Sequence, residues 1–265
     1  ATGMILATGP TGSGKSTTLY TILDILNQPD VNISTVEDPV EYQMPRVNQT
    51  QVRPDIGFTF ATGLRSLVRQ DPDIIMVGEI RDNETASLAV NAALTGHLVL
   101  STLHTNSAAG AIPRLIDMKI EPFLLASTIS VVIGQRLVRR LADAKDRKAL
   151  TRAELTALGK VVDLERMLSL LRNEKVIGPA HGWDKVQFGA PKAGEGDDGY
   201  KGRIGMHEVF KMSSAIKELA IKNATSEVIE IQAKKEGMMT MLEDGIFKAA
   251  QGLTTIEEVL RVVSE

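Results

Sequence analysis

The sequence predicts an α/β fold in which helices flank a largely parallel central sheet. Over roughly the first half of the chain, apolar runs that indicate strands alternate with segments whose apolar residues recur at helical spacing. A glycine-rich loop joins the first predicted strand to the first predicted helix. Together these features favour a sheet whose loops carry the chemistry at one edge.

The glycine-rich loop carries the clearest chemical signal. Residues 9–17 match in full the phosphate-binding pattern G-x-x-x-x-G-K-[ST]. The apolar run 4–8 before the loop predicts a buried strand, and residues 17–27 after it predict a helix with one leucine-rich face. A strand, a glycine loop and a helix are the context that this motif requires, so a glycine turn without a ligand is the weaker interpretation.

Each residue type of the loop has a physical role in binding a nucleotide. Glycines let backbone N–H groups converge on phosphate oxygens, and the positive end of the helix adds to that field. The Lys15 ammonium is expected to reach the β- and γ-phosphates, and the Ser16 hydroxyl to ligate Mg²⁺. The nucleotide-binding residues predicted here are Gly9, Thr11, Gly12, Ser13, Gly14, Lys15, Ser16 and Thr17.

The other elements follow from periodicity and turn residues. Further strands are predicted at 31–36, 73–78 and 97–103, and further helices at 59–70 and 83–94. Residues 41–52 place a few apolar side chains among polar ones and predict a hairpin or an extended loop. From Ser213 the chain is predicted to be helical to its end, with methionines such as Met238 and Met241 packed in a core.

The composition changes after Leu141. Residues 142–200 are charged and glycine-rich, and they contain a helix capping box from Thr151 to Glu154, a second short helix at 161–171 and a predicted mobile loop at 193–199. The chain therefore divides into three predicted parts, which are residues 1–141, the cysteine-free segment 142–200, and residues 201–265 with a strand followed by a helical subdomain.

Charge and composition exclude several classes of protein. With 265 residues and a net charge of −3, the chain can build a sizeable core and has no bulk field that attracts nucleic acid. The absence of cysteine excludes disulfides and thiolate metal sites. No apolar run approaches the roughly 20 residues of a membrane span. Because the loop motif begins at residue 9, we expect a fragment whose upstream domains are absent.

Acidic residues follow two of the predicted strands. Glu37, Asp38 and Glu41 crowd one turn, where their mutual repulsion needs a cation or a proton-transfer role to compensate it. A solvated acidic turn is an equally good interpretation from composition alone. Glu79 ends the apolar strand 73–78 and can carry a carboxylate toward a metal ion. Because the carboxyl ends of parallel strands share one edge, these acids can reach the phosphate loop.

Two of the four histidines flank a predicted strand. His97 precedes residues 98–103 and His104 follows them, which places His104 on the phosphate side. There His104 could hydrogen-bond a γ-phosphate or an acid, although a single histidine at a strand end is more often structural.

Four segments occur together and in a fixed order. Residues 9–17, 37–41, 78–82 and 95–106 resemble the Walker A motif, Asp box, Walker B motif and His box of the secretion ATPase superfamily. Within it, the chain most resembles the hexameric motors of type IV pilus assembly and type II secretion. The resemblance is dense over residues 1–141 and resumes at Gly202-Arg203-Ile204-Gly205-Met206-His207-Glu208.

The resemblance implies a RecA-like P-loop core, a C-terminal helical subdomain and Mg²⁺-dependent ATP hydrolysis. It implies that Glu41 orients or deprotonates the attacking water, that Glu79 binds Mg²⁺ through water together with Ser16, and that His104 senses the γ-phosphate. The arginines that match the family are Arg65, Arg69, Arg81, Arg114 and Arg203, of which Arg81 is expected to contact the nucleotide.

The resemblance also implies partners and a location. The family's motors are homo-hexamers in the cytoplasm, held at the inner membrane by a platform protein and completed by an N-terminal domain that this sequence lacks. No nucleic-acid partner is expected, so a translocase on the same core is disfavoured. A pilus-retraction motor, a conjugation-type secretion ATPase and a nucleotide-binding scaffold without useful hydrolysis remain alternatives.

The chain departs from the family between residues 142 and 200. Assembly and secretion motors usually carry a tetracysteine zinc module there, and this chain has no cysteine, so no zinc is expected. Retraction motors usually have a much shorter link, which favours assembly or secretion. The segment is expected to have its own small apolar core, formed by Leu164, Met167, Leu168, Leu171, Trp183 and Val186.

Overall fold

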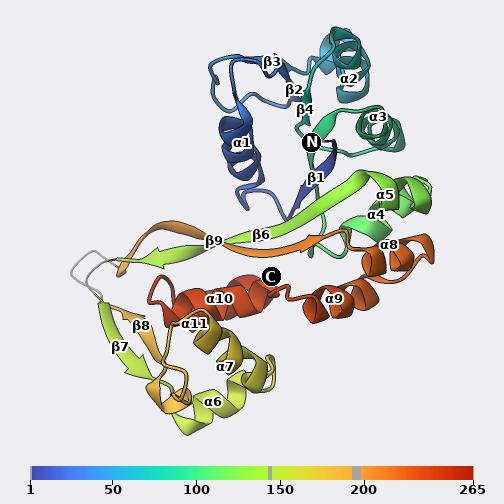
Figure 1. Ribbon diagram of the computed structural model, residues 1–265. Helices are drawn as coiled ribbons and strands as arrows, with labels where there is room; N and C mark the ends of the chain where they lie inside the picture. Colours follow the sequence, from blue (N-terminus) through green and yellow to red (C-terminus); the bar gives the residue numbers. More distant parts are fainter. Residues whose placement is uncertain (1, 143–144, 193–197, 265) are drawn as a thin grey trace. The chain divides into compact units, whose positions relative to one another are not determined.

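A seven-stranded sheet with the order β3-β2-β4-β5-β1-β6-β9 organises the chain (Figure 1). Its strands are β1 (Gly3–Thr8), β2 (Ile33–Glu37), β3 (Val47–Gln51), β4 (Ile74–Val77), β5 (Leu98–Leu103), β6 (Ile129–Leu141) and β9 (Tyr200–Lys211). The pairings that join β3, β2, β4, β5, β1 and β6 are all parallel. The largely parallel sheet predicted from the sequence is confirmed.

The computed structural model describes residues 2–142, 145–192 and 198–264, and it forms two compact units. The first unit comprises Ala1–Gln135 and Val209–Met238, and the second comprises Arg136–Glu208 and Met239–Glu265. Segment 142–200 thus belongs to a larger unit that includes the last two helices. The three-part division at residues 141 and 200 stays a prediction, and most of the predicted loop at 193–199 lies outside the described residues.

Helices cover both faces of the sheet in the first unit. These helices are α1 (Lys15–Leu26), α2 (Phe60–Leu67), α3 (Asn83–Leu94), α4 (Ala111–Asp117), α5 (Pro122–Thr128), α8 (Ser214–Ile221) and α9 (Ser226–Lys235). Helix α1 lies on one side of the strands, and α2 and α3 lie on the other (Figure 1). The helices predicted at 83–94 and after Ser213 are confirmed, and the helix predicted at 17–27 begins two residues earlier.

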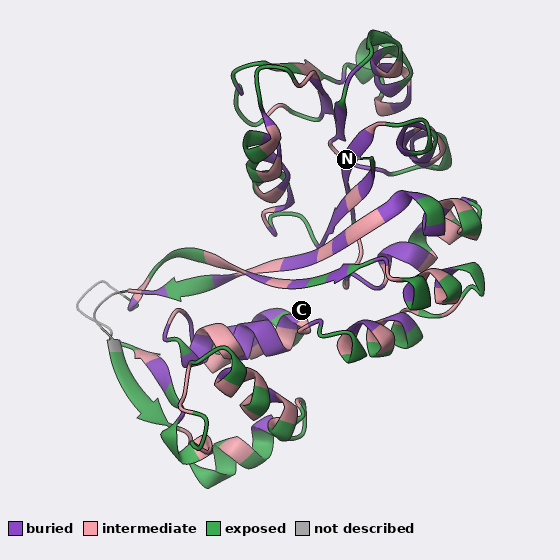
Figure 2. Ribbon diagram, viewed as in Figure 1, coloured by how far each residue is buried: buried purple, intermediate pink, exposed green. Residues whose placement is uncertain are grey.

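The two faces of the sheet bury alternate residues of each central strand. In β4, Ile75 and Val77 pack into the cluster under α2 and α3, whereas Ile74 and Met76 pack into the cluster under α1. This is the period-two alternation of a strand whose successive side chains point to opposite faces. Because both faces are covered, β4 and β5 are buried along their whole length (Figure 2).

Local sequence signals fix where several helices begin. The Thr59 side chain accepts a hydrogen bond from the Thr62 backbone N–H and starts α2 with a capping box. Asp82 accepts from the Thr85 N–H and starts α3. In the second unit, the capping box predicted from Thr151 to Glu154 is confirmed.

Residues 41–52 correct one expectation. They contain β3, an edge strand parallel to β2, rather than the predicted hairpin or extended loop. The prediction was wrong because only Val47 in this strand is apolar, and an edge strand needs little burial to pair. Gln49 of β3 instead supplies hydrogen bonds to the acidic turn, as described below.

The second unit contains a pair of antiparallel strands and four helices among its described residues. Strands β7 (Lys145–Ala149) and β8 (Gln187–Pro191) pair with each other, and the helices are α6 (Arg152–Leu158), α7 (Leu164–Asn173), α10 (Met241–Ala250) and α11 (Ile256–Ser264). The pair β7–β8 was not predicted, since its residues lack an apolar pattern, and the helix predicted at 161–171 begins at Leu164.

The apolar core of segment 142–200 is shared rather than its own. Met167, Leu171 and Val186 are fully buried, and they belong to one cluster with Ile246 and Ala249 of α10. The other residues predicted for this core, Leu164, Leu168 and Trp183, are partly buried against the same cluster. The expectation of a self-contained core was wrong, because two short helices and two strands bury too little surface by themselves.

Candidate functional site

The glycine loop between β1 and α1 is shaped to surround an anion. Gly12 and Gly14 have φ values of +77° and +88°. Apart from Gly12 and its two chain neighbours, no heavy atom of the described residues lies within 4 Å of the position that a Cβ on Gly12 would take. Gly14 is the N-cap of α1, where no side chain caps the helix. Backbone N–H groups at an uncapped helix start, beside open space, are the donors that a phosphate needs.

Lys15 is folded back onto the loop. Its ammonium donates hydrogen bonds to the carbonyl oxygens of Gly9 (2.8 Å) and Pro10 (2.9 Å). Burial lowers the pKa of Lys15, while the nearby charge of Glu79 acts in the opposite direction and raises it. The positive charge is thus placed in a desolvated position, where its attraction to a phosphate is stronger than in water.

Strand β6 supports the loop from a distant part of the sequence. The Gln135 side-chain amide donates to the Ser13 carbonyl at 2.8 Å, and Gln135 is buried. Gly9, with φ of +143°, lies so close to Gln135 and Ser13 that a Cβ there would collide with both. A glycine is therefore required at position 9 for close packing as well as for its backbone conformation.

The acids of the turn after β2 have different environments. Glu37 is 3% exposed, and its carboxylate accepts hydrogen bonds from Tyr20, from Thr35 (2.5 Å) and from Gln49 (3.3 Å). Asp38 and Glu41 are exposed. Glu37 is therefore committed to neutral donors inside the fold, and the two exposed acids remain available for chemistry.

Glu79 follows the end of β4, and its carboxylate contacts an arginine and a histidine. Arg81 forms an ion pair with Glu79 Oε1, and His104 Nε2 lies 3.2 Å from Glu79 Oε2. The hydrogen bond to Glu79 raises the pKa of Arg81, and the charge of Asp38 acts in the same direction. His97, by contrast, lies 2.8 Å from the Ala92 carbonyl and holds the end of α3.

The four predicted segments meet at one edge of the sheet. In the register of the parallel strands, Thr8 aligns with Leu103, and Val36 aligns with Val77. The glycine loop follows Thr8, and the His104 segment follows Leu103. The acidic turn follows Val36, and the Glu79 segment follows Val77. The electrostatic couplings of Lys15 with Glu79 and of Arg81 with Asp38 link the segments.

The remaining predicted residues divide by position. Thr11, Ser16 and Thr17 are exposed at the loop and the first turn of α1. Arg65 pairs with Glu84 at 2.5 Å, which is a link between α2 and α3 on the surface. Three further arginines that match the family are also exposed, namely Arg69, Arg114 and Arg203.

Two site residues could not be found from motif spacing. Tyr20 looks like one more apolar position on the predicted helix, although its hydroxyl bonds to Glu37. Gln135 lies 122 residues after the loop residue that it holds. The only sequence signal for either is a polar atom within an otherwise apolar element.

The donor set fits a magnesium ion that is also held by phosphates. Ser16 offers a hydroxyl on the first turn of α1, and Glu79 offers a carboxylate that is coupled to Lys15. Mg²⁺ is usually bound by one or two protein oxygens together with phosphates and water. Among the described residues, no group of three or more histidine and acidic side chains could hold a metal by itself.

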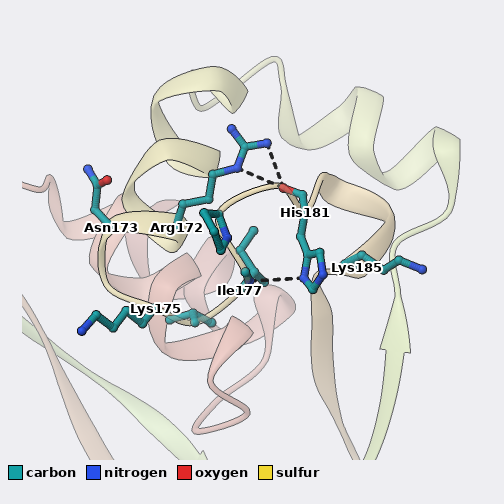
Figure 3. Close-up of a pocket in the computed structure, with 9 residues that line it drawn as sticks. Arg172, Asn173, Lys175, Ile177, His181 and Lys185 are labelled. Atoms are coloured by element: carbon teal, nitrogen blue, oxygen red, sulfur yellow. Dashed lines mark hydrogen bonds between the residues drawn. The ribbon is translucent and has the colours of Figure 1, made fainter.

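A separate pocket of about 620 Å³ lies in the second unit (Figure 3). The Arg172 guanidinium donates to the His181 carbonyl at 2.8 and 3.0 Å, so this charge supports the chain that follows α7. Lys175 and Lys185 extend to opposite sides of the pocket (Figure 3). The cations therefore do not converge on a common point, and the pocket has no catalytic arrangement.

Comparisons with known proteins agree with this geometry. The family model described as "Type II/IV secretion system protein" matches residues 1–261. The type II secretion system protein E of Xanthomonas campestris is 50% identical over 99% of this chain and 44% of that protein. The pilus assembly ATPase PilB of Thermus thermophilus is 46% identical over 97% of this chain and 27% of that protein.

A solved structure extends the likeness to three dimensions. The pilus retraction motor PilT, crystallised with ADP, is 31% identical and superposes with a TM-score of 0.67, covering 98% of this chain and 61% of that one. The chain spans less than half the length of the curated relatives named above. With a P-loop, an acidic turn, Glu79 and His104 in the family's order, this chain belongs to the type II/IV secretion system protein family.

Proposed function

We propose that this chain is an ATP-hydrolysing motor domain that powers type IV pilus assembly or type II protein secretion. The observation that carries the proposal is the meeting of the glycine loop, the acidic turn, Glu79 and His104 at one sheet edge. Relatives with 45% to 50% identity are named type II secretion protein E or pilus assembly ATPase PilB, which supports both branches.

Each chemical group of the site has a part in phosphoryl transfer. Lys15 and the loop N–H groups bind the phosphates, and Glu41 orients or deprotonates the attacking water. Ser16 and Glu79 would hold Mg²⁺, which supplies charge neutralisation between the phosphates. His104, which lies beside Glu79, would sense the γ-phosphate through a hydrogen bond. The protein's contribution is mainly positioning and electrostatic stabilisation.

The choice of Glu41 as the water-activating acid has structural support. Glu37 is buried and both of its oxygens already accept hydrogen bonds, so it cannot take a proton from water without disturbing at least one of them. Glu79 is paired with Arg81 and His104. Glu41 is exposed at the same edge, and its backbone N–H is fixed by the Tyr20 hydroxyl at 3.2 Å.

The whole motor is proposed to be a homo-hexamer at the cytoplasmic side of the inner membrane. The named relatives are more than twice as long as this chain, which supports an additional N-terminal domain in the working motor. The proposed anchor at the membrane is a platform protein. Separately, none of the described helices is long and apolar enough to cross a membrane. With a net charge of −3, no nucleic-acid partner is proposed.

Segment 142–200 is proposed to work without zinc. The sequence offers no thiolate ligand. The apolar cluster shared with α10 and the hydrogen bonds of Arg172 to His181 give this segment other sources of order. Elemental analysis of the purified protein is expected to find no stoichiometric zinc.

A retraction or conjugation-type motor of the same superfamily is the second candidate. The likeness to PilT over 98% of this chain supports it, although the identity is 31%. The same ATP chemistry serves all of these machines, so the choice among them depends on the partners that the motor engages.

Substitution of Lys15 tests the nucleotide site. Lys15→Ala removes the charge that faces the phosphates and is expected to weaken ATP binding at least about 100-fold and to abolish phosphate release. Lys222→Ala, at an exposed lysine after α8, is the matched control and should match wild type. Titration with a fluorescent ATP analogue measures the affinity, and unchanged affinity in Lys15→Ala would refute the assignment of the loop.

A further inference from the structure

A buried tyrosine hydroxyl joins the phosphate loop to the acidic turn. Tyr20 lies in α1, the helix that begins at Lys15, and is 1% exposed. Its hydroxyl donates to Glu37 Oε2 and accepts the backbone N–H of Glu41 at 3.2 Å. One oxygen atom therefore contacts both ends of the turn that carries Asp38 and Glu41.

The hydroxyl belongs to a network that spans three elements. Glu37, at the end of β2, also accepts hydrogen bonds from Thr35 and from Gln49 of β3. The Gln49 amide donates in addition to the Tyr42 carbonyl at 3.0 Å. Burial raises the pKa of Tyr20, and the hydrogen bond to Glu37 and its charge raise the pKa further, so the phenol stays a donor.

Packing alone does not account for this arrangement. The Tyr20 ring fills the apolar cluster under α1, beside Leu19 and Leu23, and a phenylalanine would fill the same volume. The hydroxyl carries a polar group into that cluster, and the carboxylate of Glu37 is buried without a cationic hydrogen-bond partner among the described residues. Burying these groups costs free energy that packing does not require.

The acidic turn, which the Tyr20 hydroxyl holds, also interacts with the part of the site formed by Glu79 and Arg81. Asp38 is coupled electrostatically to Arg81, which pairs with Glu79. A shift of the turn would therefore change the distance of Asp38 from Arg81, and that of Glu41 from the phosphates above Lys15.

We propose that Tyr20 is a positioning residue, whose hydroxyl holds the acidic turn in register with the phosphate loop so that Glu41 faces the attacking water. This inference rests on the proposed ATPase function. It predicts that loss of the hydroxyl impairs the chemical step and leaves nucleotide binding intact, because Lys15 and the loop donors do not depend on Tyr20 for their hydrogen bonds.

The direct test compares Tyr20→Phe with Tyr42→Phe in the natural full-length chain. Tyr42 packs edge-on against Tyr20 with ring centroids 4.7 Å apart, and its hydroxyl makes no hydrogen bond to the part of the chain that the structure describes. Each variant therefore removes one hydroxyl from the same ring pair. Tyr20→Phe is expected to lower kcat about 10- to 100-fold, with nucleotide affinity within about twofold of wild type.

Tyr42→Phe should retain both kcat and affinity. If Tyr20→Phe and Tyr42→Phe have the same kcat while wild type hydrolyses ATP, the positioning role is wrong and the proposed function stands. If wild type itself does not hydrolyse ATP, the proposed function fails and this inference fails with it.

A double variant separates positioning from stability. Tyr20→Phe leaves the buried carboxylate of Glu37 short of a donor and can impair folding, whereas adding Glu37→Gln removes the buried charge, which is the larger part of that cost. The double variant still lacks an acceptor for the Glu41 N–H, so its kcat is expected to stay low even when thermal unfolding shows a native fold. Recovery of wild-type kcat in the double variant would show that Tyr20 only satisfies Glu37, and would overturn the proposal.

Discussion

Glu37 and Glu41 stand four residues apart in one acidic turn, yet the structure gives them different environments. Glu37 is buried under three hydrogen bonds, while Glu41 is exposed and only its backbone is held. The difference arises because Glu37 is the last residue of β2 and points into the fold, whereas Glu41 follows the turn. The same residue type thus supports structure at one position and is available for chemistry at the other.

The carboxylate of Glu258, in the second unit, makes the free energy of unfolding depend on pH. Burial alone raises the pKa of Glu258, but hydrogen bonds from Arg139 and Arg261 outweigh it and bring the pKa to about 2. Because the pKa is lower in the folded state, the stabilisation is present above the unfolded-state value near 4.5 and is lost as the pH falls toward 2. Glu258→Gln should therefore lower the free energy of unfolding by about 2 kcal/mol at pH 7, and by less at pH 3.

Urea denaturation at both pH values measures this effect. Glu257→Gln is the control, since Glu257 is the exposed neighbour on the same helix and should change stability little. Equal stability of the two variants at pH 7 would contradict the assigned role of the Arg139–Glu258–Arg261 cluster.

The sequence predicted the placement of those candidate site residues that a motif or a strand end marks. Lys15, Glu79 and His104 each follow a strand of a parallel sheet, and this geometry alone brings them to one edge. The hydrogen bonds of the Tyr20 hydroxyl and the Gln135 amide could not be predicted. The first depends on the direction of the Tyr20 side chain, and the second joins Gln135 to Ser13, which lies 122 residues earlier in the chain. Long-range hydrogen bonds of this kind leave no periodic signal.

At the level of helices and strands, prediction succeeded where burial is periodic. Strands β4 and β5 and helix α3 have continuous or periodic apolar patterns, and all three were predicted. Strands β3, β7 and β8 were missed because edge or two-stranded pairings tolerate polar residues on both faces. Strand β6 was missed as well, since its buried residues recur at irregular spacing. Their existence depends on a neighbouring strand that the local sequence does not specify.

Helix α7 offers a test of the shared core. Leu171→Ala empties a fully buried position and should lower the free energy of unfolding by about 2–5 kcal/mol. Because Leu171 packs in one cluster with Ile246 and Ala249, hydrogen-exchange protection of the α10 amides should fall as well.

Val161→Ala, at a position 55% exposed in the same segment, should leave the protection of α10 unchanged. If Leu171→Ala lowered protection in α7 alone, segment 142–200 would have the separate core that the sequence indicated.

The proposed motor is expected to complete its catalytic site with a neighbouring subunit or domain. The family's relatives are longer, and every catalytic candidate named above lies in the first unit at one sheet edge. Glu41 and Ser16 are exposed there, so a neighbouring subunit or domain could exclude water and complete the site. This is the physical basis for proposing that hydrolysis requires a ring.

The most direct measurement is Mg²⁺-ATP turnover against protein concentration for the natural full-length chain, with Glu41→Gln and Glu79→Gln beside wild type. We expect turnover per chain to rise with concentration as rings assemble, and Glu41→Gln to bind ATP without hydrolysing it. Turnover per chain that is independent of concentration would mean that each chain completes its own site. A Glu79→Gln variant that alone bound ATP without hydrolysis would contradict the choice of Glu41 as the water-activating acid.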